Sequence, residues 1–127
     1  MPDNTPPTTR RNLCVLVVED EFLIAMEIGY MLENQGYSVL GPAGSVAQAL
    51  QMLETERPDA AVLDVNLRGE LVTPVAERLH DLRIPFVVSS AYSSMSFSGN
   101  PVLMDAQLLV KPADEARLAQ ALDRVIG

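Results

Sequence analysis

The chain reads Leu13-Cys14-Val15-Leu16-Val17-Val18-Glu19-Asp20, six apolar residues that run without a break into two acids. A short run of this kind is typical of a strand buried on both faces of a parallel sheet. Three later runs have the same character: Ala60–Leu63, Pro85–Ser89 and Leu108–Val110. Together the four runs predict the central strands of a parallel β-sheet.

Each of these runs is followed by polar residues that are candidates for catalysis or ligand binding. In chain order they are Glu19 and Asp20, then Asp64, Ser90 and Lys111. Ser89 precedes Ser90, but side-chain alternation along the strand favours Ser90. Parallel sheets bind ligands beyond the carboxyl ends of their strands, where the strand order reverses. We therefore expect these polar residues to converge in one site.

Between the runs, apolar residues recur every three or four positions, the period of a helix that packs on one side. Such patterns predict a first helix from about Glu21 to Gln35 and a second after the cap residue Ser45, with Gln48 completing a capping box. A third helix is expected after the Arg68-Gly69 turn, and a last one after the cap residue Asp114.

A further strand is expected at Val39-Leu40, ended by Gly41-Pro42. Residues 93–101 are rich in serine, glycine and proline, so a helix there should be short or loosely held. Five strands alternating with about five helices predict a doubly wound α/β domain, with a five-stranded parallel sheet and helices on both faces.

Length and composition limit the class of protein. The 127 residues suit one domain, predicted over 13–127, after a flexible proline-rich tail at 1–12. A formal net charge of −8 argues against direct binding of nucleic acid. No apolar stretch reaches the roughly 18 residues of a membrane span, so we expect no membrane insertion and a cytoplasmic protein. Cys14, the single cysteine, is expected to be a small buried hydrophobe.

The predicted site has the chemistry of phosphoryl transfer. Three crowded carboxylates repel one another, so Glu19, Asp20 and Asp64 need a positive charge among them. Mg²⁺ suits a pocket of oxygen ligands, and Lys111 adds a second cation while Ser90 adds a hydroxyl donor. The chain has no phosphate-binding GxxxxGK[ST] loop, so one carboxylate is itself a candidate acceptor, forming an acyl phosphate. Alone, each residue has an ordinary alternative, such as first-turn acids of a helix or a serine in a turn.

These residues, in this order, resemble the receiver domains of two-component response regulators. The intervals from Asp20 to Asp64, to Ser90 and to Lys111-Pro112 are close to those usual in the family, and the likeness spans Leu13 to the C-terminus. The resemblance implies the flavodoxin-like receiver fold. It also implies roles for six residues: Asp64 as phosphoacceptor, Asp20 as direct Mg²⁺ ligand, Glu19 as a ligand through water, Asn66 as a ligand through its backbone carbonyl, Ser90 as the switch hydroxyl and Lys111 as the phosphate-binding lysine.

Two segments also resemble a subgroup of stand-alone receivers common in alphaproteobacteria: Asp64–Glu70 and Ile84–Val87. The subgroup usually reads Phe-Ala-Thr-Gly at the fourth strand end, whereas this chain has Val88–Tyr92 there. The family often has Tyr or Phe three residues before the lysine, and here Leu108 takes that place.

The first predicted helix carries a second apolar stripe, made by Phe22, Met26 and Tyr30. This stripe is separate from the one expected to face the sheet, so it is either covered by neighbouring loops or exposed for a partner. The resemblance implies that a sensor histidine kinase or a histidine phosphotransfer protein docks on this helix. We expect a monomer or a weak dimer.

The chain stops soon after its last predicted helix, so we expect no attached effector domain. The leading hypothesis is a single-domain response regulator that accepts a phosphoryl group on Asp64 with Mg²⁺ and acts by partner binding or by phosphate competition, without being an enzyme in the ordinary sense. One alternative is a Mg²⁺-dependent phosphohydrolase with an aspartyl phosphate, although such enzymes usually carry a second Asp where this chain has Asn66. Another is a degenerate receiver that serves only as a docking module.

Overall fold

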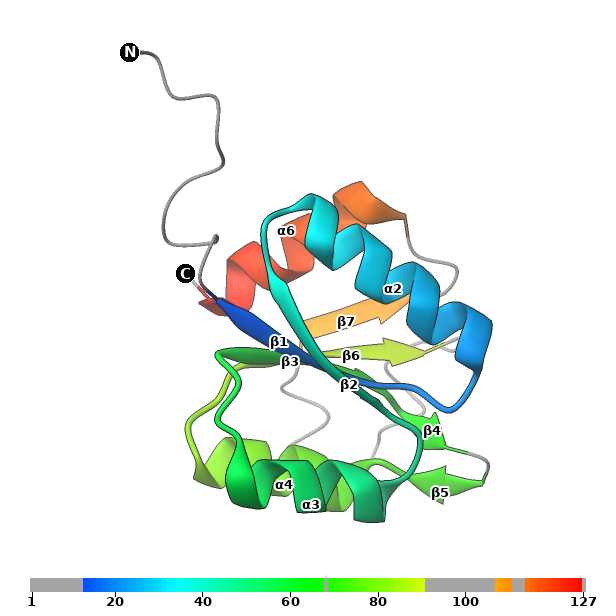
Figure 1. Cartoon of the computed structure of the whole chain (residues 1–127), viewed down its shortest axis with the longest axis vertical. Helices are drawn as coiled ribbons and strands as arrows, with labels where there is room; N and C mark the ends of the chain where they lie inside the picture. Colours follow the sequence, from blue (N-terminus) through cyan, green and yellow to red (C-terminus); the bar gives the residue numbers. More distant parts are fainter. Residues whose placement is uncertain (1–12, 68, 91–106, 111–113, 127) are drawn as a thin grey trace.

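The computed structural model describes residues 13–67, 69–90, 107–110 and 114–126. Its centre is a parallel sheet in the order β2-β1-β3-β6-β7, as Figure 1 shows. This sheet confirms the predicted fold. Its strands are β1 (Cys14–Val18), β2 (Ser38–Ala43), β3 (Ala60–Asp64), β6 (Phe86–Ser90) and β7 (Gln107–Val110).

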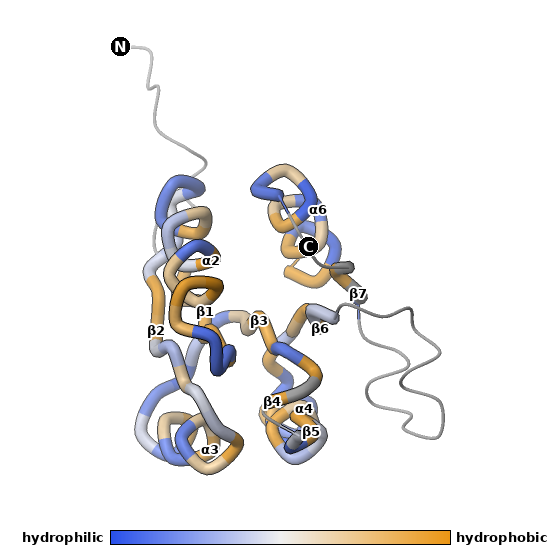
Figure 2. The backbone as a smooth tube through the Cα atoms, turned by 90° about the vertical axis from the view of Figure 1, so that its right-hand side faces the viewer, coloured by the Kyte–Doolittle hydropathy of each residue, from blue (hydrophilic) through white to orange (hydrophobic). Residues whose placement is uncertain are grey.

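Two pairs of helices cover the two faces of this sheet (Figures 1 and 2). α2 (Phe22–Asn34) and α6 (Glu115–Ile126) pack on one face, and α3 (Val46–Thr55) and α4 (Thr73–Asp81) pack on the other. The predicted tail at 1–12 and the predicted loosely held helix at 93–101 lie outside the described residues.

The position of β1 between two helix layers explains why its sequence is apolar without alternation. Val15 and Val17 pack in the core beneath α2 and α6, whereas Leu16 and Val18 pack in the core beneath α3 and α4. All four side chains are at most 1% exposed. Because successive side chains in a strand point to opposite faces, a helix layer on each side favours apolar residues at every buried position of β1.

The predicted helix caps are present, with one difference. The Ser45 hydroxyl oxygen accepts a hydrogen bond from the Gln48 N–H at 3.1 Å, and Asp114 Oδ1 accepts one from the Arg117 N–H at 2.8 Å. Gln48 Oε1, however, accepts from the N–H of Gly44 at 2.8 Å. A standard capping box would place this bond on the cap residue itself. The box therefore closes one residue earlier than the sequence predicts.

The prediction that Gly41-Pro42 ends the second strand is wrong, because β2 continues to Ala43. β2 lies at an edge of the sheet, where a proline does not remove a hydrogen bond from an inner ladder. The pairing of β2 with β1 shifts register at this point, and Gly41 has a φ of +98°. The extension matters because it brings Ala43 beside the end of β1.

The sequence predicts only a turn at Arg68-Gly69, but the structure has a small antiparallel hairpin around it. β4 (Asn66–Leu67) pairs with β5 (Glu70–Leu71), and Gly69 has a φ of +85°. The N–H of Val72 donates to the carbonyl of Val65 at 3.0 Å and closes the base of the hairpin. Strands of two residues are too short to show a period, so no pattern predicts them.

Cys14 is half-buried, so the expected buried position is only partly correct. It is the first residue of β1, just before the strand enters the core, and its N–H donates to Asp59 Oδ2 at 2.8 Å. Burial raises the pKa of the Cys14 thiol, and the negative charges of Asp59 and Glu56 raise it further. The thiol is therefore protonated and weakly nucleophilic at neutral pH.

Substitution of Gly41 by alanine should destabilise the fold. A Cβ at this position would lie 2.9 Å from both the Ala43 nitrogen and the Val17 carbonyl oxygen, with φ in the left-handed region. We expect the free energy of unfolding to fall by about 1–3 kcal/mol, measured by urea denaturation.

Gly29→Ala is the matched control. Gly29 lies within α2, and a Cβ there would meet only a Val39 methyl carbon at 3.9 Å. Because alanine favours a helix more than glycine, this variant should be unchanged or more stable by up to about 1 kcal/mol. Equal stability changes in the two variants would contradict the argument.

Candidate functional site

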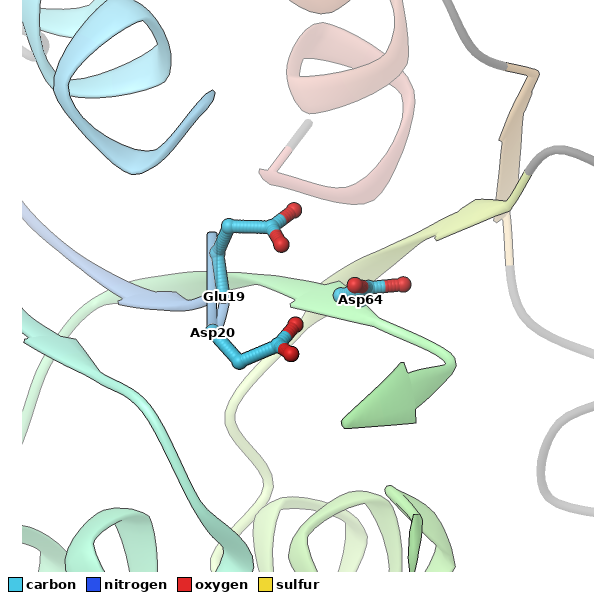
Figure 3. A group of neighbouring side chains, drawn as sticks. All are labelled: Glu19, Asp20 and Asp64. Carbon is cyan, nitrogen blue, oxygen red and sulfur yellow. The ribbon is translucent and has the colours of Figure 1, made fainter. Parts of the chain in front are cut away.

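Three carboxylates meet at one end of the sheet. Glu19 and Asp20 directly follow β1, and Asp64 is the last residue of the neighbouring strand β3. One carboxylate oxygen from each residue lies within 4.8 Å of the others. Figure 3 shows these side chains gathered where the two strands end. The predicted convergence of the three acids is confirmed.

The order of the strands explains this location. From β1 the chain passes to β2 on one side of it and then to β3 on the other side. The connecting helices α2 and α3 therefore lie on opposite faces of the sheet. A reversal of this kind leaves the carboxyl ends of the two strands accessible to a ligand between the diverging connections.

Backbone contacts hold the first two acids in place. The N–H of Glu19 donates to the carbonyl of Ala43 at 2.9 Å, and Glu19 Oε2 accepts from the N–H of Glu21 at 3.1 Å. A Cβ built on Gly44 would come within 4.0 Å of the Asp20 Cα, so the two backbones pass close to each other. This contribution of Ala43 and Gly44 was not predicted, because the strand was expected to end at Gly41-Pro42.

Burial makes the carboxylate group costly without a cation. Glu19 is 3% exposed and Asp64 is 8% exposed, while Asp20 is partly exposed. Three negative charges this close repel one another strongly where little water screens them. An all-oxygen donor set fits a hard divalent cation such as Mg²⁺, which keeps several waters.

The structure describes two of the three remaining predicted site residues. Ser90 ends β6, is buried and pairs with Val110 of β7, whereas Ser89 pairs with Asp64. Asn66 lies in β4, two positions after Asp64. Lys111 lies outside the described residues, directly after β7. The roles of Ser90, Asn66 and Lys111 stay predictions.

One apolar surface lies beside the site, on α2. The predicted stripe is exposed, and Leu23, which the stripe was not expected to include, is exposed beside it. α2 begins two residues after Asp20, so this stripe starts next to the carboxylates. The large exposed apolar side chains of α2 are Phe22, Leu23, Met26 and Tyr30.

Among the described helices, none combines the length and the apolar character needed to cross a membrane.

Known proteins are similar to this chain in sequence and fold. Residues 15–123 match the family described as "Response regulator receiver domain". The transcriptional regulatory protein PdtaR of Mycobacterium tuberculosis is 31% identical over 129 residues, which covers 97% of this chain and 63% of PdtaR. The solution structure of SdrG from Sphingomonas melonis Fr1 is 39% identical with a TM-score of 0.77, covering 92% of this chain and 98% of SdrG.

A fourth comparison extends the likeness to a longer regulator. The crystal structure of the response regulator PhyR from Brucella abortus is 28% identical with a TM-score of 0.78, and the match covers 91% of this chain and 48% of PhyR. The chain therefore spans less than two thirds of the length of PdtaR and about half that of PhyR. The sheet order, the acidic group at the switch point and these matches agree, and the chain belongs to the receiver domain family of response regulators.

Proposed function

We propose that this receiver domain accepts a phosphoryl group on Asp64 from a phosphohistidine donor and signals by binding a partner or by competing for phosphate. The observation that carries the proposal is the meeting of Glu19, Asp20 and Asp64 within 4.8 Å at the switch point of the sheet. Asp64 suits the acceptor role because it ends β3, while the other two acids come together from the end of β1.

The transfer step needs one nucleophile and a donor. An Asp64 carboxylate oxygen attacks the phosphorus, an O–P bond forms, and the P–N bond of the phosphohistidine breaks with its electron pair passing to the imidazole. Glu19, Asp20, Asp64 and the Asn66 carbonyl would hold Mg²⁺, which supplies charge neutralisation at the phosphoryl oxygens when bound. The protein contributes the position of the acids, which the contacts of Glu19 with Ala43 and Glu21 maintain.

Two further residues complete the proposed site. We assign Lys111 as the cation that contacts the phosphoryl group and Ser90 as the hydroxyl that senses it. β6 and β7 are neighbours and end side by side at the Ser90–Val110 pair, which supports a role for both residues at this edge. A phosphoryl group that draws in the Ser90 hydroxyl would bias the following segment of the chain.

We propose the exposed stripe of α2 as the docking surface for the phosphodonor, a histidine kinase or a histidine phosphotransfer protein. Phe22, Met26 and Tyr30 are each more than half exposed, and they lie on the helix that begins beside Asp20. Exposed apolar side chains grouped in this way are typical of protein interfaces. A donor bound there would have its histidine near Asp64.

Mg²⁺ should stabilise the protein through the three acids. We expect MgCl₂ to raise the melting temperature of the wild type, and Asp20→Asn to weaken Mg²⁺ binding by about tenfold or more, because a charged ligand is lost. In chelator, the same variant should be more stable than the wild type, since one of three mutually repelling charges is removed. Thermal unfolding across a MgCl₂ series measures both effects.

Glu33→Gln is the control for this experiment, because Glu33 is an exposed acid on α2 outside the carboxylate group. Its Mg²⁺ response should equal that of the wild type. An unchanged Mg²⁺ response in Asp20→Asn would contradict the proposed metal site.

Asp64 should be the only residue that becomes phosphorylated. Intact-mass spectrometry of the wild type with acetyl phosphate and MgCl₂ should show one added phosphoryl group, and Asp64→Asn should show none because the amide is not a nucleophile. Asp81→Asn removes an exposed acid at the end of α4 and should label normally. Labelling of Asp64→Asn at the wild-type rate, or full labelling in chelator, would refute the proposal.

A charge placed on α2 should block a protein donor but not a small one. We expect Met26→Asp to lower phosphoryl transfer from a histidine kinase by about tenfold or more, because a charge would be buried in an apolar interface. Labelling by acetyl phosphate should stay unchanged, since Met26 is outside the acidic site. Gln51→Asp adds the same charge on an exposed position of α3 and is the control. Equal loss in both variants would contradict docking on α2.

A further inference from the structure

Glu70 makes a contact that the proposed function does not explain. Its Oε1 accepts a hydrogen bond from the N–H of Val46 at 3.4 Å, across 24 residues of sequence. Glu70 lies in β5 of the hairpin that follows Asp64, and Val46 is the first residue of α3. This bond therefore joins the hairpin to the first turn of a helix from a different part of the chain.

The segment that ends at Val46 also contacts the other half of the acidic site. The carbonyl of Ala43 accepts from the N–H of Glu19, and Gly44 passes close to the Cα of Asp20. The four residues Ala43–Val46 thus hold the pair of acids after β1 at one end and the hairpin after β3 at the other. A shift of either attachment changes the distance between the two halves.

The chemistry at the start of α3 favours a hydrogen-bond acceptor at this point. Ser45 accepts from the Gln48 N–H, and the Gln48 side chain accepts from the Gly44 N–H. The Val46 N–H donates instead to the distant Glu70 side chain. The first N–H groups of a helix have no partner within the helix, so an acceptor from elsewhere in the chain satisfies this one.

Other contacts also hold the hairpin. Leu67 is 3% exposed and packs in the core under α3 and α4, and the Val72–Val65 backbone hydrogen bond closes the hairpin base. Val65 in turn donates to the carbonyl of Ser89 at 3.1 Å. Loss of the Glu70 side chain should therefore loosen the hairpin against α3 without unfolding it.

We propose that Glu70 is a positioning residue of the acidic site: through the Val46 N–H it fixes the β4–β5 hairpin, and with it Asn66, relative to Asp64, Asp20 and Glu19. The inference rests on the proposed Mg²⁺ ligands. Glu70 contributes as a hydrogen-bond acceptor, so its glutamine variant, which keeps a side-chain carbonyl oxygen, should preserve the effect while removing the charge.

The test is a titration of the ¹⁵N-labelled full chain with MgCl₂, followed by amide chemical shifts without any phosphodonor. Glu70→Ala should raise the half-saturating Mg²⁺ concentration by about threefold, a change of the size that one exposed hydrogen bond contributes. Glu70→Gln should stay close to the wild type. Amide hydrogen exchange at Val46 should accelerate in Glu70→Ala alone.

Glu77→Ala is the matched control, because it removes an exposed carboxylate from α4 and should leave Mg²⁺ binding unchanged. Equal weakening in Glu70→Ala and Glu70→Gln would show that only charge matters and would overturn the positioning role. Unchanged Mg²⁺ binding in Glu70→Ala would also overturn it.

The outcomes separate this inference from the proposed function. A wild type that is labelled on Asp64 while Glu70→Ala binds Mg²⁺ normally contradicts the Glu70 inference alone. A wild type whose Mg²⁺ binding depends on Glu70 but that is never labelled contradicts the phosphoacceptor role alone. A wild type that does not bind Mg²⁺ overturns both.

Discussion

Burial of β1 on both faces is the constraint on which the rest of the structure depends. A strand covered by helices on each side favours apolar side chains along its length, as Val15 to Val18 show by being almost fully buried. Polar chemistry can begin only where the strand leaves the core, at Glu19 and Asp20. The same rule acts on β3, which ends at Asp64. Because neighbouring parallel strands end at the same edge, the acids gather there.

Three carboxylates held close together repel one another, and contacts of the surrounding backbone keep them in place. Glu19 is held through the Ala43 carbonyl, and the hairpin after Asp64 is held through Val46. The short segment from the end of β2 to the start of α3 therefore links both sides of the acidic group. Rigid attachment keeps like charges close, which in turn favours a bound cation. The site thus depends on the chain segments after β1, β2 and β3 as well as on the three carboxylate side chains.

The predictions succeeded where a pattern was long enough to carry a period. The buried runs, the helix of α2 and the caps at Ser45 and Asp114 all follow from local rules, and the structure confirms them. They failed at β2 and at the β4–β5 hairpin. In β2, the edge position made Pro42 acceptable within a strand, and an edge position is not visible in one segment of sequence. The hairpin strands are too short for any period.

The sequence by itself determined the fold class, the acidic site and the family resemblance, because apolar runs that end in Glu19-Asp20 and Asp64 allow few other arrangements. Only the tertiary structure decided which segments support that site. The contacts of Ala43 with Glu19 and of Glu70 with Val46 join residues that no local pattern relates. They depend on strand order and register, and these arise from packing of the whole sheet between its two helix layers.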